Sequence, residues 1–177
     1  HARCQLAAFD TNLTIPPRGW VMALTRELPD EIALRRAAIV PLGYDPRSHV
    51  RWKRYRYTLL LSPVRDPFAE GRTWRLADEL ALEAMQREAA DLLGTRDFRA
   101  FRGAADERED TIRTLTAVRL SRRGPCLDVV VEGDRFMYHM VRIIVGALAA
   151  VGRVRPARGA LARPLGRGVR RALGVTA

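Results

Sequence analysis

An alternating hairpin followed by an apolar helical segment is the feature that most restricts the fold of this 177-residue chain. Residues 115–121 and 126–132 alternate apolar and polar side chains around an Arg-Arg-Gly-Pro turn, which is typical of two antiparallel strands. Residues 137–151 then repeat apolar side chains at the three- and four-residue spacing of a core-facing helix. Strands and a helix so close together in the chain indicate an α+β fold.

Weaker patterns predict the remaining elements. Residues 75–93 have helical spacing, with acidic residues in the first turn and Gly94 after the last apolar position, so they predict a second long helix. Shorter helices are predicted over 20–26 and 161–173. Strands are predicted over 3–9, 31–41 and 50–61, and a loop over 95–110. Together these elements predict a central, mostly antiparallel sheet flanked by helices.

Composition excludes several classes of protein. Hydrophobic residues make up 47% of the chain, which is enough for a buried core. The longest apolar run is about half of what a membrane span needs. Cys4 and Cys126 lie too far apart for a disulfide scaffold or a CxxC site, so we expect two reduced thiols in a cytoplasmic protein. The three histidines lack metal-ligand spacing, and no Ser-His-Asp set and no HExxH, P-loop or GxGxxG motif occurs.

The net charge of +11 favours a polyanionic partner, with nucleic acid first. The charge is unevenly distributed along the chain. Residues 153–177 contain seven arginines and no acidic residue, so this tail contributes +7. The first 152 residues contribute only +4.

A basic segment with interleaved aromatic residues is the first candidate for function. It contains the cations Arg47, Arg51, Lys53, Arg54 and Arg56 and the aromatic residues Trp52, Tyr55 and Tyr57. Cations contact phosphates and aromatic rings stack on bases, so this composition suits RNA. Strand alternation places Tyr55 with Lys53 on one face and Arg54 with Arg56 on the other. A solvated strand with packed aromatic rings is the alternative that this segment alone leaves open.

Arg142 is the second candidate, because it is the one strongly charged residue within the apolar segment 137–151. A guanidinium held against a core needs a carboxylate or phosphate partner to offset its desolvation. An arginine that extends to solvent is the alternative.

The segment between the two long predicted helices gives weaker signals. Asp97, Phe98 and Phe101 are interpreted as residues that anchor a loop. The acidic residues of this segment have no ligand-like spacing and predict a solvated loop; they are Asp106, Glu107, Glu109 and Asp110.

Six stretches, taken in order, resemble the TruA-type tRNA pseudouridine synthases. HARCQLAAFDT is similar to the segment that follows the family's Gly-Arg-Thr-Asp-x-Gly-Val-His motif, and LTRELPDEI to its Leu-Asn-x-x-Leu-Pro element, with Thr25 in place of the usual Asn. PRSHVRWKRYRYTLLLSP resembles the family's Ala-Arg…Tyr-x-Tyr strand, and GTRDFRAFRG a family loop. FMYHMVRIIVGAL resembles its Phe…His-x-Met-Val-Arg helix, and ALGVTA the start of its Thr-Ala-Pro-x-x-Gly-Leu segment.

The resemblance implies the pseudouridine synthase fold, with two RRM-like or ferredoxin-like halves of which the first is truncated. Residues 1–49 would be the remainder of the N-terminal half of the catalytic domain. Residues 50–177 would be the C-terminal half, with the Arg-rich tail 153–177.

The resemblance also implies roles for single residues. Tyr55 is similar to the tyrosine that stacks on the target uracil, Arg142 to the arginine that pairs with the catalytic aspartate, and Arg47 to an arginine near the RNA-binding cleft. We expect Lys53, Arg54 and Arg56 to contact RNA as well. The implied activity is isomerisation of uridine to pseudouridine in the anticodon stem-loop of tRNA, at the family's positions 38–40. The family works as a cytoplasmic homodimer and needs no cofactor or metal.

One departure from the family concerns its nucleophile. The family's aspartate would lie four positions before His1, and the closing Gly-Leu element would lie beyond Ala177. We therefore expect a fragment that binds tRNA but is catalytically inactive by itself. A non-catalytic RNA-binding module is the alternative. A basic structural protein of the ribosomal type lacks support, because the charge is not spread along the chain.

Overall fold

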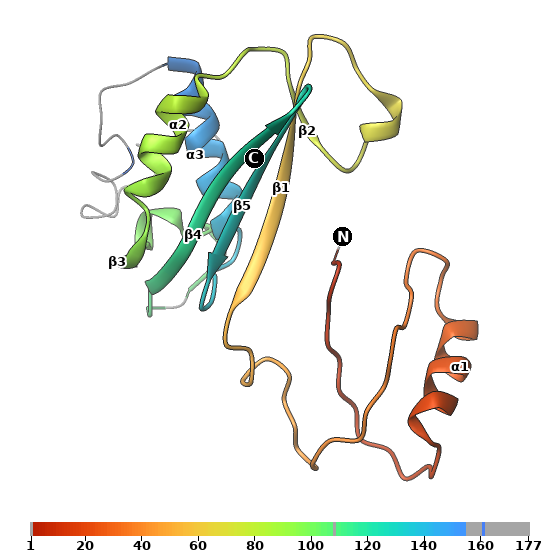
Figure 1. Ribbon diagram of the computed structural model, residues 1–177. Helices are drawn as coiled ribbons and strands as arrows, with labels where there is room; N and C mark the ends of the chain where they lie inside the picture. The colour runs from red at the N-terminus through yellow and green to blue at the C-terminus, as the bar shows by residue number, and fades with distance from the viewer. Residues whose placement is uncertain (1, 108, 155–160, 162–177) are drawn as a thin grey trace. The chain divides into compact units, whose positions relative to one another are not determined.

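A five-stranded sheet carries most of the ordered structure. The computed structural model describes residues 2–107, 109–154 and 161, and the chain divides into a first unit, His1–Val50, and a second unit, Arg51–Ala177, which contains the sheet (Figure 1). The strands are β1 (Lys53–Leu61), β2 (Trp74–Leu76), β3 (Gly94–Asp97), β4 (Ile112–Arg123) and β5 (Cys126–Gly133), in the spatial order β2-β1-β5-β4-β3. β1 pairs with β2 in parallel, and the other neighbours are antiparallel, which confirms the predicted mostly antiparallel sheet.

The predicted hairpin is confirmed as β4 and β5, and it extends beyond the predicted ends. Arg123 lies opposite Cys126, so the connection is the two-residue loop Gly124-Pro125. Gly124 has a φ of +57°, a left-handed value that glycine adopts without steric cost and that tight hairpin turns require. A register shift between Leu115 and Ala117 interrupts the ladder near the far end of the hairpin.

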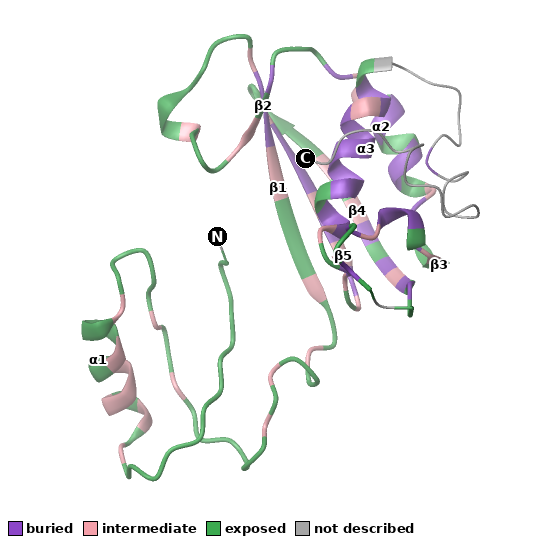
Figure 2. Cartoon of the chain, turned by 180° about the vertical axis from the view of Figure 1, so that it is seen from behind, coloured by how far each residue is buried: buried purple, intermediate pink, exposed green. Residues whose placement is uncertain are grey.

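Two helices cover one face of the sheet. α2 (Leu82–Ala90) and α3 (Met140–Val154) pack on each other and on the strands, and Figure 1 shows both on the same side. We call this side the covered face; it carries the fully buried Leu59, Val129 and Val131. Figure 2 shows buried residues running along α3 and the neighbouring strands. The α+β fold with a sheet flanked by helices is therefore confirmed.

The predicted helix over 75–93 is only partly correct. Its central part forms α2, but Trp74–Leu76 forms β2 and pairs with Leu59–Leu61 of β1. Pairing with β1 satisfies the backbone hydrogen-bonding groups of this segment, so it forms a strand rather than a helical turn. The Leu76 side chain is buried in the core from this strand. The predicted loop over 95–110 is also only partly correct, since Gly94–Asp97 forms β3 and Arg99–Phe101 forms the 3-10 helix η2. A further 3-10 helix, η1 (Pro67–Ala69), lies between β1 and β2.

The first unit contains one described helix, α1 (Pro17–Glu27), which confirms and extends the helix predicted over 20–26. Proline in its first turn suits a helix start, and Leu28 leaves the helical conformation just before Pro29. The strands predicted over 3–9 and 31–41 are wrong, because neither segment pairs with a described neighbour. Their large apolar side chains, among them Leu6, Phe9 and Ile39, are exposed within this structure.

Several predictions can be placed only in part. The helix predicted over 137–151 is confirmed as α3, which begins three residues later. The helix predicted over 161–173 and the tail arginines after Arg153 lie outside the described residues. Arg153 itself pairs with Asp78 at 3.1 Å. Within the part of the chain that the structure describes, no helix combines the length and apolar character needed to cross a membrane.

The backbone and side chains pack closely around Gly133, at the end of β5. A Cβ atom at this position would lie 2.7 Å from the Thr114 carbonyl oxygen and 3.3 Å from the ring of Phe136. Gly133→Ala is expected to lower the free energy of unfolding by about 1–3 kcal/mol, because backbone and ring must both shift. Urea-induced unfolding measures the change. Ser121→Ala, at an exposed position of β4, is the control and should stay within about 0.5 kcal/mol of the unaltered protein. Equal stability of the two variants would contradict the close packing.

Candidate active site

β1 separates its side chains onto the two faces of the sheet, as the alternation predicts. Tyr55 lies on the covered face, where it is 45% exposed and meets the Phe136 ring edge-to-face at 5.1 Å between centroids. Lys53 shares this face and is half-buried. Arg54 and Arg56 extend from the opposite face, where they pair with Glu132 and Asp128 of β5. The basic segment is therefore not one surface but two.

The segment between β5 and α3 positions Arg142. It runs from Phe136, which contacts Tyr55, to His139, whose φ of +58° turns the chain into the helix. Arg142 is the third residue of α3 and its side chain is exposed, which agrees with the alternative of an arginine that extends to solvent. A cation in the first turn opposes the helix dipole, so a carboxylate placed beside Arg142 would be stabilised by both positive charges.

The loop after β3 holds this segment in place. The Gly103 N–H donates to the Tyr138 carbonyl at 2.9 Å, and the Tyr138 N–H donates to the Asp106 carboxylate at 2.7 Å. A Cβ atom on residue 103 would lie 2.8 Å from the Tyr138 carbonyl oxygen, so only glycine allows this approach. Asp106 is buried, which contradicts its prediction as a solvated residue. The loop after β3 and the segment before α3, which are far apart in the sequence, are thus hydrogen-bonded to each other at the start of α3.

Two fully buried rings anchor this loop. Phe98 and Phe101 meet edge-to-face at 5.7 Å between ring centroids and belong to the core. Their interpretation as anchors of a loop is therefore confirmed.

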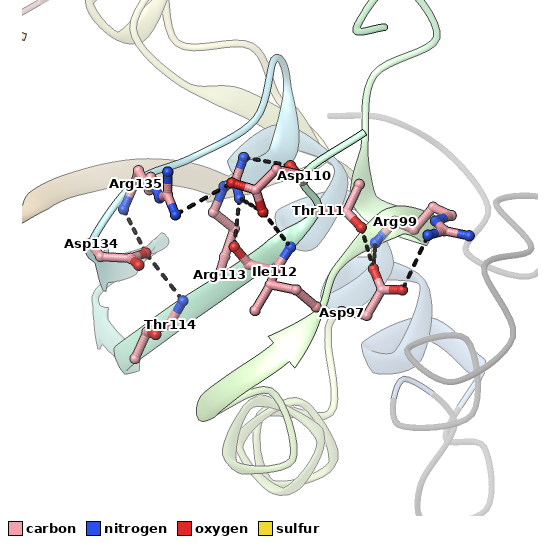
Figure 3. A network of polar contacts seen from close by, with 9 residues as sticks. All are labelled: Asp97, Arg99, Asp110, Thr111, Ile112, Arg113, Thr114, Asp134 and Arg135. Carbon is pink, nitrogen blue, oxygen red and sulfur yellow. Dashed lines mark hydrogen bonds and ion pairs between the residues drawn. The ribbon is translucent and has the colours of Figure 1, made fainter. Parts of the chain in front are cut away.

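Acidic residues tie the same loops to the start of β4, as Figure 3 shows. Asp110 pairs with Arg113 at 3.1 Å and with Arg135 at 3.3 Å. Asp134 accepts hydrogen bonds from the backbone N–H groups of Thr114 and Arg135. Asp110 therefore joins two loops, and its prediction as a solvated residue is incomplete.

Asp97 is held in a similar way. Its carboxylate accepts a hydrogen bond from the Thr111 hydroxyl at 2.6 Å and from the Arg99 N–H at 2.9 Å. The Thr111 hydrogen bond is the main reason why the pKa of Asp97 lies below its ordinary value of 3.8. Partial burial opposes this shift, and the Arg99 N–H and guanidinium reinforce it.

Arg47 lies in the first unit, in a turn of residues 45–49. The Asp45 carboxylate accepts the N–H groups of Arg47 at 2.9 Å and of Ser48 at 3.1 Å, and the Arg47 hydrogen bond is the main cause that lowers the pKa of Asp45. The Arg47 side chain is exposed. Arg47 therefore lies in a hydrogen-bonded turn, and the role of Arg47 in RNA binding stays a prediction.

Sequence reasoning missed the residues that support the candidate site rather than those that form its centre. Phe136, Gly103 and Asp106 connect segments more than 30 residues apart, and no local pattern marks such contacts. Among the residues that the structure describes, no group of three or more histidine, cysteine or acidic side chains is placed to hold a metal ion.

The Asp97–Thr111 hydrogen bond predicts a pH-dependent stability. A carboxylate with a lowered folded-state pKa stabilises the fold above its unfolded-state pKa, near 3.8, and this contribution disappears as the pH falls through the folded-state value. Thr111→Val is expected to lower the free energy of unfolding by about 1 kcal/mol at neutral pH and by less in acid. Denaturant unfolding at several pH values measures the difference. Thr111→Ser keeps the hydroxyl and should keep the pH dependence. A deficit in Thr111→Val that does not change with pH would contradict this account.

Comparison with known proteins places these elements in a family. The sequence model of a family described as tRNA pseudouridine synthase matches residues 89–175. A protein named tRNA pseudouridine synthase A from Halalkalibacterium halodurans is 41% identical over all 177 residues, which correspond to 67% of its length. Proteins of the same name from Acetivibrio thermocellus and Geotalea uraniireducens are 40% identical over 86% of the chain and 37% identical over the whole chain. The chain spans 62% and 72% of their lengths, so it corresponds to about two thirds of these relatives.

Proposed function

The chain belongs to the tRNA pseudouridine synthase family, and we propose that it supplies part of a pocket that isomerises uridine to pseudouridine in tRNA. The observation that carries the proposal is the contact between Tyr55 and Phe136. The contact joins β1, which carries Tyr55, to the segment that leads into α3, the helix that carries Arg142. The proposed substrate is the anticodon stem-loop, at the family's positions 38–40.

Tyr55 suits a stacking role. The ring of Phe136 meets the Tyr55 ring edge-to-face and restricts it, while Tyr55 remains 45% exposed and so stays accessible. A uridine must leave the stem-loop stack before its ring can be reached, and an exposed aromatic face compensates for the lost stacking. The Tyr55 hydroxyl would then be a candidate base near the flipped uracil.

Arg142 suits a role in keeping a catalytic aspartate ionised and oriented. In the proposed reaction the aspartate carboxylate attacks the nucleotide at C1′ or at C6, the bond between C1′ and N1 breaks, and the uracil turns. C5 then bonds to C1′, the bond to the aspartate breaks so that the carboxylate is released, and the proton on C5 passes to a base, for which the Tyr55 hydroxyl is the candidate. A guanidinium beside the aspartate keeps the carboxylate ionised and oriented, because a neighbouring cation lowers a carboxylate pKa. Arg142 lies in the first turn of α3 and its side chain is exposed to solvent.

Other parts of the proposal concern partners and place of action. Arg47, Lys53, Arg54 and Arg56 are proposed to contact RNA, and all except the half-buried Lys53 are exposed. The protein is proposed to act as a homodimer in the cytoplasm, without a metal or another cofactor. For the 177-residue polypeptide alone, a non-catalytic RNA-binding module is the alternative function.

Tritium release from tRNA labelled at C5 of uridine tests the function. Formation of the C1′–C5 bond expels the C5 hydrogen, so a full-length protein should release tritium from an unmodified tRNA transcript. The 177-residue polypeptide, folded as judged by circular dichroism, should bind the same transcript without release, because the family's aspartate is not among its residues. Release by the polypeptide at the full-length rate would show that another residue is the nucleophile. A full-length protein that releases no tritium would refute the proposed function.

Tyr55→Phe separates stacking from proton transfer. The phenyl ring keeps the contact with Phe136, so tRNA binding should be retained. Turnover should fall by about 10²–10⁴-fold if the hydroxyl moves a proton in the reaction. Tyr57→Phe is the matched control, since Tyr57 lies two residues along the same face and packs against the core. Single-turnover kinetics of both variants make the comparison. Near-normal turnover in Tyr55→Phe would limit Tyr55 to stacking.

A further inference from the structure

The face of the sheet opposite α2 and α3 carries a layer of arginine side chains. We call it the open face. It is defined by Trp52, Arg54, Arg56, Arg119 and Arg123 together with Asp128 and Glu132. Arg56 of β1 and Arg119 of β4 both lie opposite Val130, so they flank β5 from its two sides. Cations from two strands therefore surround carboxylates from the strand between them.

The carboxylates lie beneath and the guanidinium groups lie outside. Glu132 Oε1 accepts Arg54 Nε at 2.9 Å and Arg119 Nη1 at 3.0 Å. Asp128 Oδ2 lies 3.1 Å from Arg123 Nη2 and 3.9 Å from Arg56 Nε. The two acidic side chains are 14% and 12% exposed, whereas the four arginines are 49% to 74% exposed. A molecule that approaches this face meets arginine first.

The open face has more positive charge than its ion pairs require. One guanidinium is enough to neutralise one carboxylate, but Asp128 and Glu132 each pair with two arginines. The four arginines and two carboxylates together therefore carry a net charge of +2. The pairing also restricts the guanidinium groups, so less rotamer entropy is lost when they bind a ligand. Trp52 extends the same surface: the residue is 59% exposed, and the Arg54 guanidinium lies 5.3 Å from the centroid of its ring.

We propose that the open face binds the phosphate backbone of RNA, as a surface distinct from the end of the covered face where Tyr55 lies. Guanidinium groups bind phosphate through paired N–H donors, and arginines in a fixed array suit the regular charges of a nucleic-acid strand. Trp52 offers a ring on which a base can stack. The proposal rests on the proposed function in one respect, which is the choice of tRNA as the RNA that is bound.

Charge argues against a second copy of this chain on the open face. A two-fold dimer brings the same surface of both copies together, so it would place four guanidinium groups against four others. Such an arrangement is unfavourable, whereas a phosphate strand supplies the opposite charge and releases its counterions on binding.

Salt-dependent tRNA binding by the full-length protein tests the proposal. Arg119→Gln/Arg123→Gln removes two cations of the open face and leaves Arg54 and Arg56 to pair with the carboxylates. The slope of log K against log salt concentration should fall by about two units, because two phosphates would no longer be neutralised by arginine. The matched control is Arg87→Gln/Arg122→Gln, which removes the same charge from α2 and from the β4 residue that pairs with Glu79. This control should keep the slope of the unaltered protein.

A second variant distinguishes charge from damage to the sheet. Arg119→Lys/Arg123→Lys keeps both charges and should keep the slope within about half a unit. Equal slopes for the glutamine variant and its control would overturn the proposal, as would an equal fall in the lysine and glutamine variants. A change of oligomeric state in the glutamine variant with an unchanged slope would also overturn it and indicate a protein interface. If the slope falls as expected but the unaltered protein releases no tritium, the proposed function fails and the RNA-binding surface stands.

Discussion

The pairing of β1 with β5 is the constraint on which both functional surfaces depend. In this register Tyr55 lies opposite Val131, and Arg54 lies opposite Glu132. A shift by one residue would turn every β1 side chain to the other face of the sheet. Tyr55 would then move away from Phe136 and join the charged layer, while Arg54 would face the apolar core. Leu59 and Leu61, which belong to the core at the other end of β1, oppose such a shift, because they would have to leave the core as well.

Acidic residues in this basic protein mainly organise loops and cations. Asp106 binds the backbone at the start of α3, and Asp110 joins Arg113 to Arg135. On the open face, Asp128 and Glu132 each hold two arginines. Asp128 and Glu132 expose few atoms, and buried carboxylates need charged partners, so these two residues serve as fixed points for guanidinium groups. The positive charge of the open face is thus displayed at defined positions.

Much of the sheet could be predicted from local pattern, and its edges could not. The β4–β5 hairpin, the alternation in β1 and the apolar face of α3 each have a periodicity that is visible within a dozen residues. β2 and β3 have three and four residues, and they exist because β1 and β4 offer unpaired backbone groups beside them. The strands predicted over 3–9 and 31–41 show the reverse, since strand-forming side chains without a paired neighbour make no sheet.

The candidate site shows the same division. Tyr55 and Arg142 were identified from a resemblance in sequence, and the family that it indicated was confirmed once relatives were compared. That reasoning does not explain which contacts hold these residues in place. Gly103 is needed because Tyr138 approaches its backbone, and Asp106 is buried because it accepts the Tyr138 N–H. For Arg142 the sequence left two alternatives open, a guanidinium held against the core and an arginine that extends to solvent, and the side chain is exposed, as a residue in the first turn of a helix can be.

The alternation of β1 also couples the two surfaces mechanically. Neighbouring residues of this strand serve opposite faces, so any force that changes the pairing at Arg54 acts on the backbone that carries Tyr55. Glu132 opposes such a change, because it lies between Arg54 and Arg119 and screens their repulsion. Removing that carboxylate would leave two guanidinium groups on the strands that flank β5 without their common partner, at the level of the sheet where Tyr55 meets Phe136. Arg54, which the Glu132 carboxylate holds on the open face, and Tyr55, which meets Phe136 on the covered face, are therefore neighbours on one strand whose register serves both surfaces.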